Sequence, residues 1–171
     1  MHWPNNDVSL ADQIGALNEV RQAGKVRHIG VSNFNIALMD EAVALSDAPL
    51  VTNQVEYHPF IDQTKVMDVA RKHGMALTAY YAMADGKVLD NAELGEIAKS
   101  HDRTVAQVVL RWLLQQNDVI ALSKTATESR VAENFDIFDF ELSGEEMQAI
   151  HGLADENGRI VSPDGLAPDW D

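Results

Sequence analysis

The chain has 171 residues, of which 46% are hydrophobic and 23% charged, the size and composition of one ordinary globular domain. Its formal net charge of −14 argues against binding to nucleic acid, because phosphate backbones are bound by clusters of Lys and Arg. The absence of Cys excludes disulfides and thiolate chemistry. No stretch approaches the ~18 apolar residues of a membrane span, and the start lacks a signal-peptide pattern. We therefore expect a cytoplasmic protein without membrane contact.

The first half of the chain alternates predicted helices with predicted strands. Apolar residues at helical spacing begin at Leu10, with Ser9 as the predicted N-cap and Gly24 as the predicted stop. In chain order, the elements that we predict next are a strand over 25–31, a helix over 35–46, a strand over 50–55, a helix over 64–72 and a strand over 75–80.

The second half begins with a longer connection, residues 81–90. Two predicted helices follow over 92–100 and 104–116, and Thr104 with Gln107 has the spacing of a capping box. A strand over 119–122, a helix over 128–134 and a final helix opened by Ser143 complete the order. The tail, 154–171, is rich in Asp, Gly and Pro, and we expect it to be irregular.

This alternation predicts an α/β fold with parallel strands and right-handed crossovers. A closed (β/α)8 TIM barrel needs ~250 residues, so the chain can hold about half of one. We therefore predict a single domain over 1–171 with four β/α units, preceded by a lone helix. The strand ends of such a barrel converge on one ligand, which makes polar residues at those ends the candidate site residues.

Polar or amphipathic side chains end the first three predicted strands. Ser32 and Asn33 end the first and Gln54 the second, and their hydroxyl and amide groups are suited to hydrogen bonds with a carboxamide. By themselves such residues more often form a capping turn and a solvated strand end. Tyr80 ends the third strand, where its flat ring suits stacking on nicotinamide, although a tyrosine here also commonly packs partly into the core.

A basic cluster follows the fourth predicted strand. Lys124 and Thr125 end the strand, and Arg130 lies about one helical turn into the next helix, so the two cations can bracket one phosphate. Arg130, Glu133 and Asn134 share a helix face because they are three and four residues apart. The alternative is a solvated face with a weak Arg–Glu pair.

These segments resemble, in order, the cofactor-binding C-terminal half of the aldo-keto reductases, in particular bacterial aldehyde and diketogluconate reductases. The matching motifs are Gly-Val-Ser-Asn-Phe at 30–34, Asn-Gln-Val-Glu-Tyr at 53–57, Ala-Tyr at 79–80 and Ser-Lys-Thr at 123–125, followed by Arg130, Glu133 and Asn134. His2-Trp3-Pro4 matches the family's His-Trp-Pro, so the resemblance extends from His2 to about Leu153.

The resemblance implies NADP(H) as cofactor. The histidines show no metal-ligand spacing such as His-x-x-x-His, so we expect no metal site. The resemblance assigns Ser32, Asn33 and Gln54 to the nicotinamide carboxamide and Tyr80 to stacking on the nicotinamide ring. It further assigns Lys124, Thr125 and Arg130 to the 2′-phosphate, and Glu133 and Asn134 to the adenine. One departure concerns the diphosphate loop, where the family usually has Ser-Pro-Leu and this chain has Tyr81-Ala82-Met83, followed by Asp85.

The implied activity is reduction of an aldehyde or ketone by hydride transfer from NADPH. His2 would orient and polarise the carbonyl of a small-molecule substrate, and Trp3 would line its pocket. The family's catalytic Asp, Tyr and Lys would lie upstream of this chain, so we expect an N-terminally incomplete domain that lacks them. The alternative is a non-catalytic NADP-binding or assembly module. In either case the unpaired edge strands predict self-association.

Overall fold

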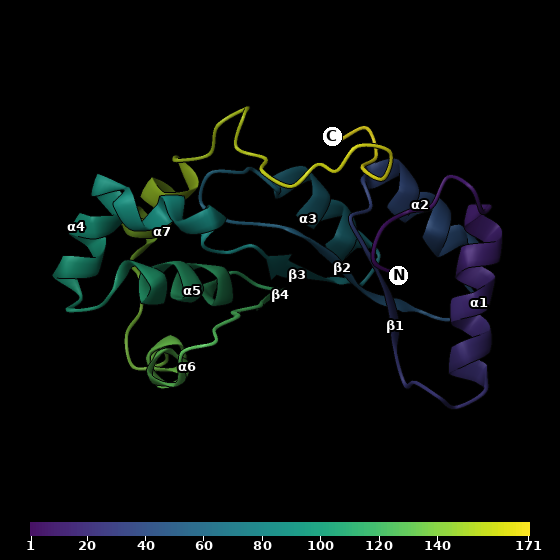
Figure 1. Cartoon of the computed structure of the whole chain (residues 1–171), viewed down its shortest axis with the longest axis horizontal. Coiled ribbons are helices and arrows are strands. Elements are labelled where there is room, and N and C mark those ends of the chain that lie inside the picture. Colours follow the sequence, from purple (N-terminus) through teal and green to yellow (C-terminus); the bar gives the residue numbers. More distant parts are fainter. The chain divides into compact units, whose positions relative to one another are not determined.

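In the computed structural model, which describes residues 1–171, four strands form one sheet in the order β1-β2-β3-β4 (Figure 1). They are β1 (Ile29–Ser32), β2 (Leu50–Glu56), β3 (Ala76–Tyr80) and β4 (Val119–Ala121). β1 and β2 are parallel, with Ile29 opposite Leu50 and Ser32 opposite Gln54. A helix follows each strand, so the predicted α/β fold with parallel strands is confirmed.

The contacts within the chain divide it into two compact parts, and their boundary falls inside β2 and β3. Part A comprises residues 1–55, 63–78 and 161–171. Part B comprises residues 56–62 and 79–160.

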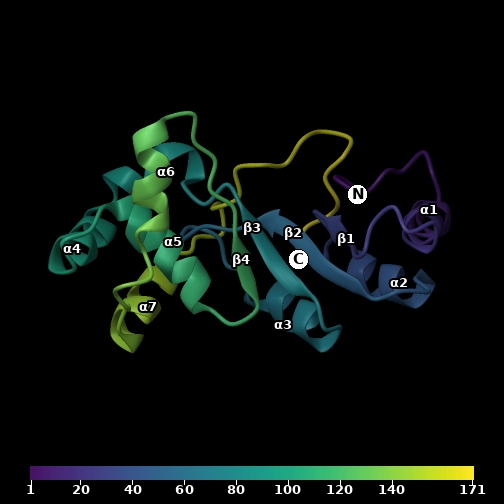
Figure 2. The same cartoon turned by 90° about the horizontal axis from the view of Figure 1, so that it is seen from below.

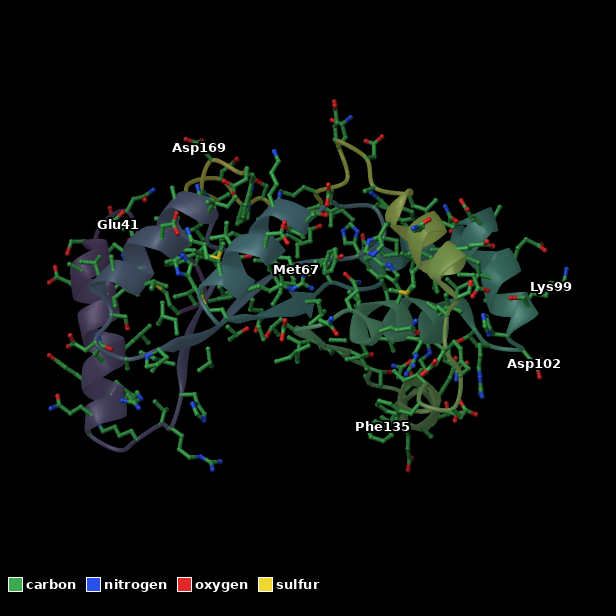
Figure 3. All side chains as sticks on the ribbon, turned by 180° about the vertical axis from the view of Figure 1, so that it is seen from behind. Glu41, Met67, Lys99, Asp102, Phe135 and Asp169 are labelled. Carbon is green, nitrogen blue, oxygen red and sulfur yellow. The ribbon has the colours of Figure 1, made fainter.

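Part A contains α1 (Leu10–Gln22), α2 (Ile36–Leu45) and α3 (Thr64–Lys72), and α2 packs against both α1 and α3 (Figure 1). The predicted caps of α1 are confirmed, because Ser9 accepts a hydrogen bond from the Asp12 N–H and Gly24 adopts the left-handed φ of 70° past the helix end. In α3, Met67 (labelled in Figure 3) is 6% exposed and belongs to the core.

Part B contains η1 (Ala84–Asp90), α4 (Ala92–Ser100), α5 (Val105–Gln115), α6 (Glu128–Phe135) and α7 (Gly144–His151). α5 contacts α4, α6 and β4 (Figure 2). The side chains of Val108, Trp112 and Leu113 in α5 are buried. The predicted capping box at Thr104 is present, and Ser143, the predicted start of the last helix, forms a second capping box with Glu146.

The first strand is shorter than the pattern predicts. It begins at Ile29, because residues 25–28 are all exposed and offer no side chain to a core. The predicted connection 81–90 contains the helix η1, whose turn is interrupted by left-handed backbone at Asp85 and Gly86. No helix or strand follows α7, and none of the helices has the length and apolar character that crossing a membrane requires.

Candidate functional site

The turn that follows β1 in part A ties the ends of β1 and β2 together. The backbone carbonyl of Gln54 accepts hydrogen bonds from the Asn33 N–H (2.9 Å) and from the Ser32 hydroxyl (2.7 Å). The side-chain amide of Asn33 in turn donates to Ser32 Oγ (3.2 Å). A hydroxyl has two acceptor positions, so Ser32 Oγ can accept one more hydrogen bond.

Asn33 adopts a left-handed backbone conformation with φ of 61°. Asparagine tolerates this region better than most residues, which accounts for an Asn at the sharp turn out of the strand. Ser32 and Asn33 are 5% and 1% exposed, whereas Gln54 is half-buried. The three predicted residues are thus brought together, and hydrogen bonds orient the side chains of Ser32 and Asn33 and the backbone of Gln54.

Asn53 is a positioning residue to which the sequence patterns assigned no role. It is fully buried, its Nδ2 donates to the Phe34 carbonyl (2.9 Å), and its Oδ1 accepts from the Phe34 N–H (3.4 Å). This paired contact closes the turn after Ser32 and Asn33. The signal in the sequence was a second amide residue beside Gln54 in the same strand, since alternate residues of a strand face opposite sides and a buried, unpartnered amide would be costly.

His2 and Trp3 lie near the same turn in part A. The carbonyl of His2 accepts from the Asn33 side-chain amide (3.0 Å), and the His2 side chain is exposed. The Trp3 ring lies 6.2 Å from the His2 ring and also 6.2 Å, edge-on, from the ring of Trp170. Trp170 belongs to the C-terminal tail, for which we predicted only irregular structure.

Side chains of part A fix this tail. Asn35 donates to the Asp169 carbonyl (2.8 Å), and the carboxylate of Asp171 accepts from the Ile36 N–H (2.8 Å) at the start of α2. A carboxylate is favoured at that helix end by the unpaired N–H groups and the helix dipole. The tail is therefore irregular in conformation but attached, and it brings a third aromatic ring to His2 and Trp3.

In part B, the predicted phosphate and adenine residues line one pocket of about 330 Å³. Its lining residues come from η1 and its cap, from the start of α5, from the end of β4 and from α6; they are Met83, Leu89, Thr104, Val105, Ala106, Ser123, Lys124, Thr125, Arg130, Glu133 and Asn134. All five residues that the sequence patterns singled out in this segment are among them. Lys124 and Arg130 are exposed, and neither belongs to any of the ion pairs of the chain.

Hydrogen bonds hold α6 in place beside this pocket. Asn134 Nδ2 donates to Ser123 Oγ (2.9 Å), which ties the helix to the end of β4. Buried Gln107 of α5 donates to the carbonyls of Glu133 (3.1 Å) and Asp136 (2.9 Å) at the end of α6. The sequence identified Gln107 only as half of a capping box, so its second role, positioning α6, was missed.

Tyr80 lines a second pocket in part B, of about 700 Å³. Residues 80–86 line it together with Leu122, Ser123 and Lys124, so Lys124 is shared by both pockets. Burial, and then the negative charge of Glu56, raise the pKa of Tyr80 to about 12, which keeps its phenol neutral at physiological pH. A neutral, half-buried ring is suited to stacking.

The loop along this second pocket is the segment that departs from the family motif. Tyr81, Ala84 and Asp85 all have left-handed backbone, with φ of 64°, 47° and 57°. The hydroxyl of Tyr81 hydrogen-bonds the carboxylate of Asp85. Asp85 therefore brings a negative charge to a pocket that also contains Lys124. Non-glycine residues with positive φ are strained, so this loop is held by its surroundings.

Residues 1–155 match the family model described as aldo/keto reductase family. The chain is 39% identical over 174 residues to methylglyoxal reductase DkgB of Escherichia coli O157:H7, covering 100% of this chain and 64% of that protein. It is 40% identical over 166 residues to glyoxal reductase of Bacillus subtilis (strain 168), covering 97% of this chain and 59% of that protein.

Solved structures give the same result. A crystal structure provisionally named 2,5-diketo-D-gluconic acid reductase B has a TM-score of 0.98 and 65% identity, covering 100% of this chain and 61% of that one. A mutant of Gox0644 in complex with NADPH has a TM-score of 0.88 and 34% identity, covering 95% of this chain and 60% of that one. The chain thus spans about three fifths of the length of these relatives, and the predicted partial (β/α)8 barrel is confirmed.

Proposed function

This chain belongs to the aldo/keto reductase family, and from that premise we propose that it forms the NADPH-binding part of a reductase that converts aldehyde or ketone carbonyls to alcohols. When bound, NADPH would supply the hydride. The names of the relatives, methylglyoxal reductase and glyoxal reductase, favour a small reactive aldehyde as substrate.

The observation that carries this proposal is the pair of exposed cations in the 330 Å³ pocket of part B. In a protein with net charge −14, Lys124 and Arg130 form a local basic site without acidic partners of their own. A guanidinium and an ammonium are the groups that bind a phosphate monoester, so we assign them, with Thr125, to the 2′-phosphate of NADPH. Glu133 and Asn134 line the same pocket and supply acceptors for the adenine amino group.

The nicotinamide end of the cofactor is assigned to the other candidates. In part A, Ser32, Asn33 and Gln54 offer a hydroxyl and two amides whose backbone is fixed by mutual hydrogen bonds, which suits them to hold a carboxamide. In part B, the half-buried neutral ring of Tyr80 suits stacking on the nicotinamide. These donor sets fit a nicotinamide dinucleotide phosphate.

For the substrate, we assign the exposed imidazole of His2 to the carbonyl oxygen and Trp3 to the apolar wall beside it. An N–H of His2 would hydrogen-bond the carbonyl oxygen and so stabilise the negative charge that develops there during reduction. Trp3 and Trp170 would exclude water from that side of the substrate.

The proton that completes the alcohol must come from an acid. The chain has three tyrosines. The hydroxyl of Tyr57 donates to Gln116 (2.7 Å) and its ring is 2% exposed, while the pKa of Tyr80, about 12, is raised away from the range that proton donation near neutral pH requires. The pKa of Tyr81 is raised as well, and its hydroxyl hydrogen-bonds the carboxylate of Asp85. This observation favours the second candidate function, an NADP-binding module without turnover, for the chain acting alone.

We also propose that copies of the chain associate. β4 lies at one edge of the sheet order, and Ile120 and Leu122 at this edge are 48% and 44% exposed. An edge strand with apolar side chains and unpaired backbone groups is a template for pairing with another strand.

The proposed function is tested by titrating the purified chain with NADPH and with NADH while following the fluorescence of the reduced nicotinamide. We expect saturable binding that is tighter for NADPH, and no reduction of methylglyoxal by the chain alone. Absence of binding, or equal affinity for the two cofactors, would contradict the assignment of the basic pocket. Turnover by the chain alone would contradict the second candidate function, an NADP-binding module without turnover.

A further inference from the structure

Glu56, the last residue of β2, has no exposed surface. Its Oε1 accepts from the Ile160 N–H (2.8 Å) and lies 3.0 Å from Nε2 of His58, which is also fully buried. The Phe60 N–H donates to Nδ1 of His58 (3.3 Å), so Nε2 is the nitrogen that carries a proton and donates to Glu56. The Arg159 guanidinium lies 3.7 Å from Oε2.

Glu56 thereby joins β2 to a segment that is about a hundred residues away in sequence. That segment, residues 155–160, is itself packed tightly against the backbone of Phe60. The Asp155 N–H donates to the Phe60 carbonyl (3.2 Å), and a Cβ atom at Gly158 would lie 1.6 Å from the same oxygen. Only glycine allows this approach. The close contact between Gly158 and the Phe60 backbone therefore places the next two residues, Arg159 and Ile160, beside Glu56.

Tyr80, at the end of β3, hydrogen-bonds the backbone of Glu56 and of Tyr57, the residue that follows it. Its carbonyl accepts from the Tyr57 N–H (3.0 Å), and its phenol oxygen accepts from the backbone of Glu56. Apart from burial, the two charges that act on this phenol are those of Glu56, which disfavours the phenolate, and Arg159, which favours it. The ring therefore lies within electrostatic reach of both members of the buried ion pair.

We propose that Glu56 is a positioning residue, which fixes the phenol of Tyr80 and residues 158–160 together at the carboxyl end of β2. A buried carboxylate paired with a guanidinium and two further donors has one orientation, and it thereby fixes the backbone of Glu56, from which the phenol oxygen of Tyr80 accepts. The consequence for catalysis rests on the proposed function, because it concerns the face that Tyr80 presents to nicotinamide. The positioning itself involves only residues of part B and does not depend on the proposed function.

The experiment follows the ionisation of Tyr80 in the full chain without cofactor. Tyrosine labelled with ¹³C at Cζ gives one signal for each of the three tyrosines, and the Tyr80→Phe variant assigns the signal of Tyr80. With a pKa of about 12, about one tenth of Tyr80 is phenolate at pH 11.

Two variants remove the two charges in turn. Glu56→Gln removes the negative charge but keeps an acceptor for the Ile160 N–H, and we expect the phenolate fraction at pH 11 to rise severalfold. Arg159→Gln removes the positive charge, and we expect the fraction to fall. Glu156→Gln is the matched control, because Glu156 is exposed in the same segment, and we expect no change.

Opposite shifts in the two variants support the proposal. Simple loosening of the structure would move Tyr80 toward its ordinary pKa of 10.0 in both variants and raise the phenolate fraction in both. A rise in both, or no change with Glu56→Gln, overturns the proposal. Should Glu56→Gln fail to fold, Arg159→Gln decides: a fall supports the proposal, and a rise or no change contradicts it.

A cofactor titration separates this proposal from the proposed function. Glu56→Gln should weaken NADPH and NADH binding by the same factor, because the nicotinamide is common to both. If the unaltered chain binds neither cofactor, the proposed function fails while the Tyr80 measurement still decides the positioning role. If binding is intact in Glu56→Gln, its role in presenting Tyr80 to the cofactor is refuted and the proposed function remains.

Discussion

Replacing Arg130 with Ala removes one of the two exposed cations from the 330 Å³ pocket of part B. If Arg130 binds the 2′-phosphate, the variant loses a charge-assisted and geometrically paired contact that only NADPH offers. The substitution should not disturb the fold, since exposed side chains away from caps and packing usually change stability by less than about 0.5 kcal/mol.

The expected magnitude follows from how exposed the contact is. A hydrogen bond to a charged group contributes about 1.5–3 kcal/mol, but ion pairs in solvent are worth only about 0.2–1 kcal/mol. Arg130 lies between these cases, exposed at the rim of a pocket with one more cation, Lys124, to share the phosphate. We expect a loss of about 1.4 kcal/mol, which is about tenfold in the Kd for NADPH.

The assay is fluorescence titration at low ionic strength with NADPH and with NADH, for the unaltered chain, Arg130→Ala and a control, Arg27→Ala. Arg27 is also exposed but lies in part A, outside the pocket, so its loss changes net charge equally. The difference in NADPH affinity between Arg130→Ala and the unaltered chain should become smaller at high salt, because screening weakens exposed electrostatic contacts. Equal losses for NADPH and NADH, or an equal effect of Arg27→Ala, would refute the reasoning.

Three further predictions test the framework around the site. Asn53→Ala removes both contacts that close the turn after β1 and leaves backbone groups unpaired, so we expect a loss of about 1–3 kcal/mol in urea unfolding. Burial alone would raise the pKa of Glu146, but hydrogen bonds from Ser143 and His101 outweigh it and lower the pKa below its ordinary 4.5. A lowered pKa in the folded state means that this stabilisation is complete above pH 4.5 and is lost as the pH falls through the folded value, so Glu146→Gln should destabilise the chain more at pH 7 than at pH 3. Finally, Ile120→Lys places a charge on the exposed edge strand, and light scattering should show less self-association than for the unaltered chain, whereas a monomeric unaltered chain at high concentration would contradict the edge-pairing proposal.

Local patterns were sufficient for most element boundaries. α3 and α4 occupy the predicted residues, and the caps at Ser9, Thr104 and Ser143 form as expected, because capping depends on residues three positions apart. The start of β1 was wrong, since apolar content within a stretch does not reveal which residues another element will cover. The roles assigned to the site residues stay predictions, although five of them do share one pocket.

The sequence by itself determined the order of the elements, the parallel sheet and the residue types at each strand end, because helical and strand periodicity, caps and glycine stops are local properties. Only the tertiary structure decided which polar groups meet across long separations in the chain. It joined Asn53 to Phe34, Gln107 to the end of α6, and Glu56 to Arg159 and Ile160. Such contacts depend on strand register and on backbones that approach within van der Waals distance, as at Gly158, and no spacing in the sequence encodes either.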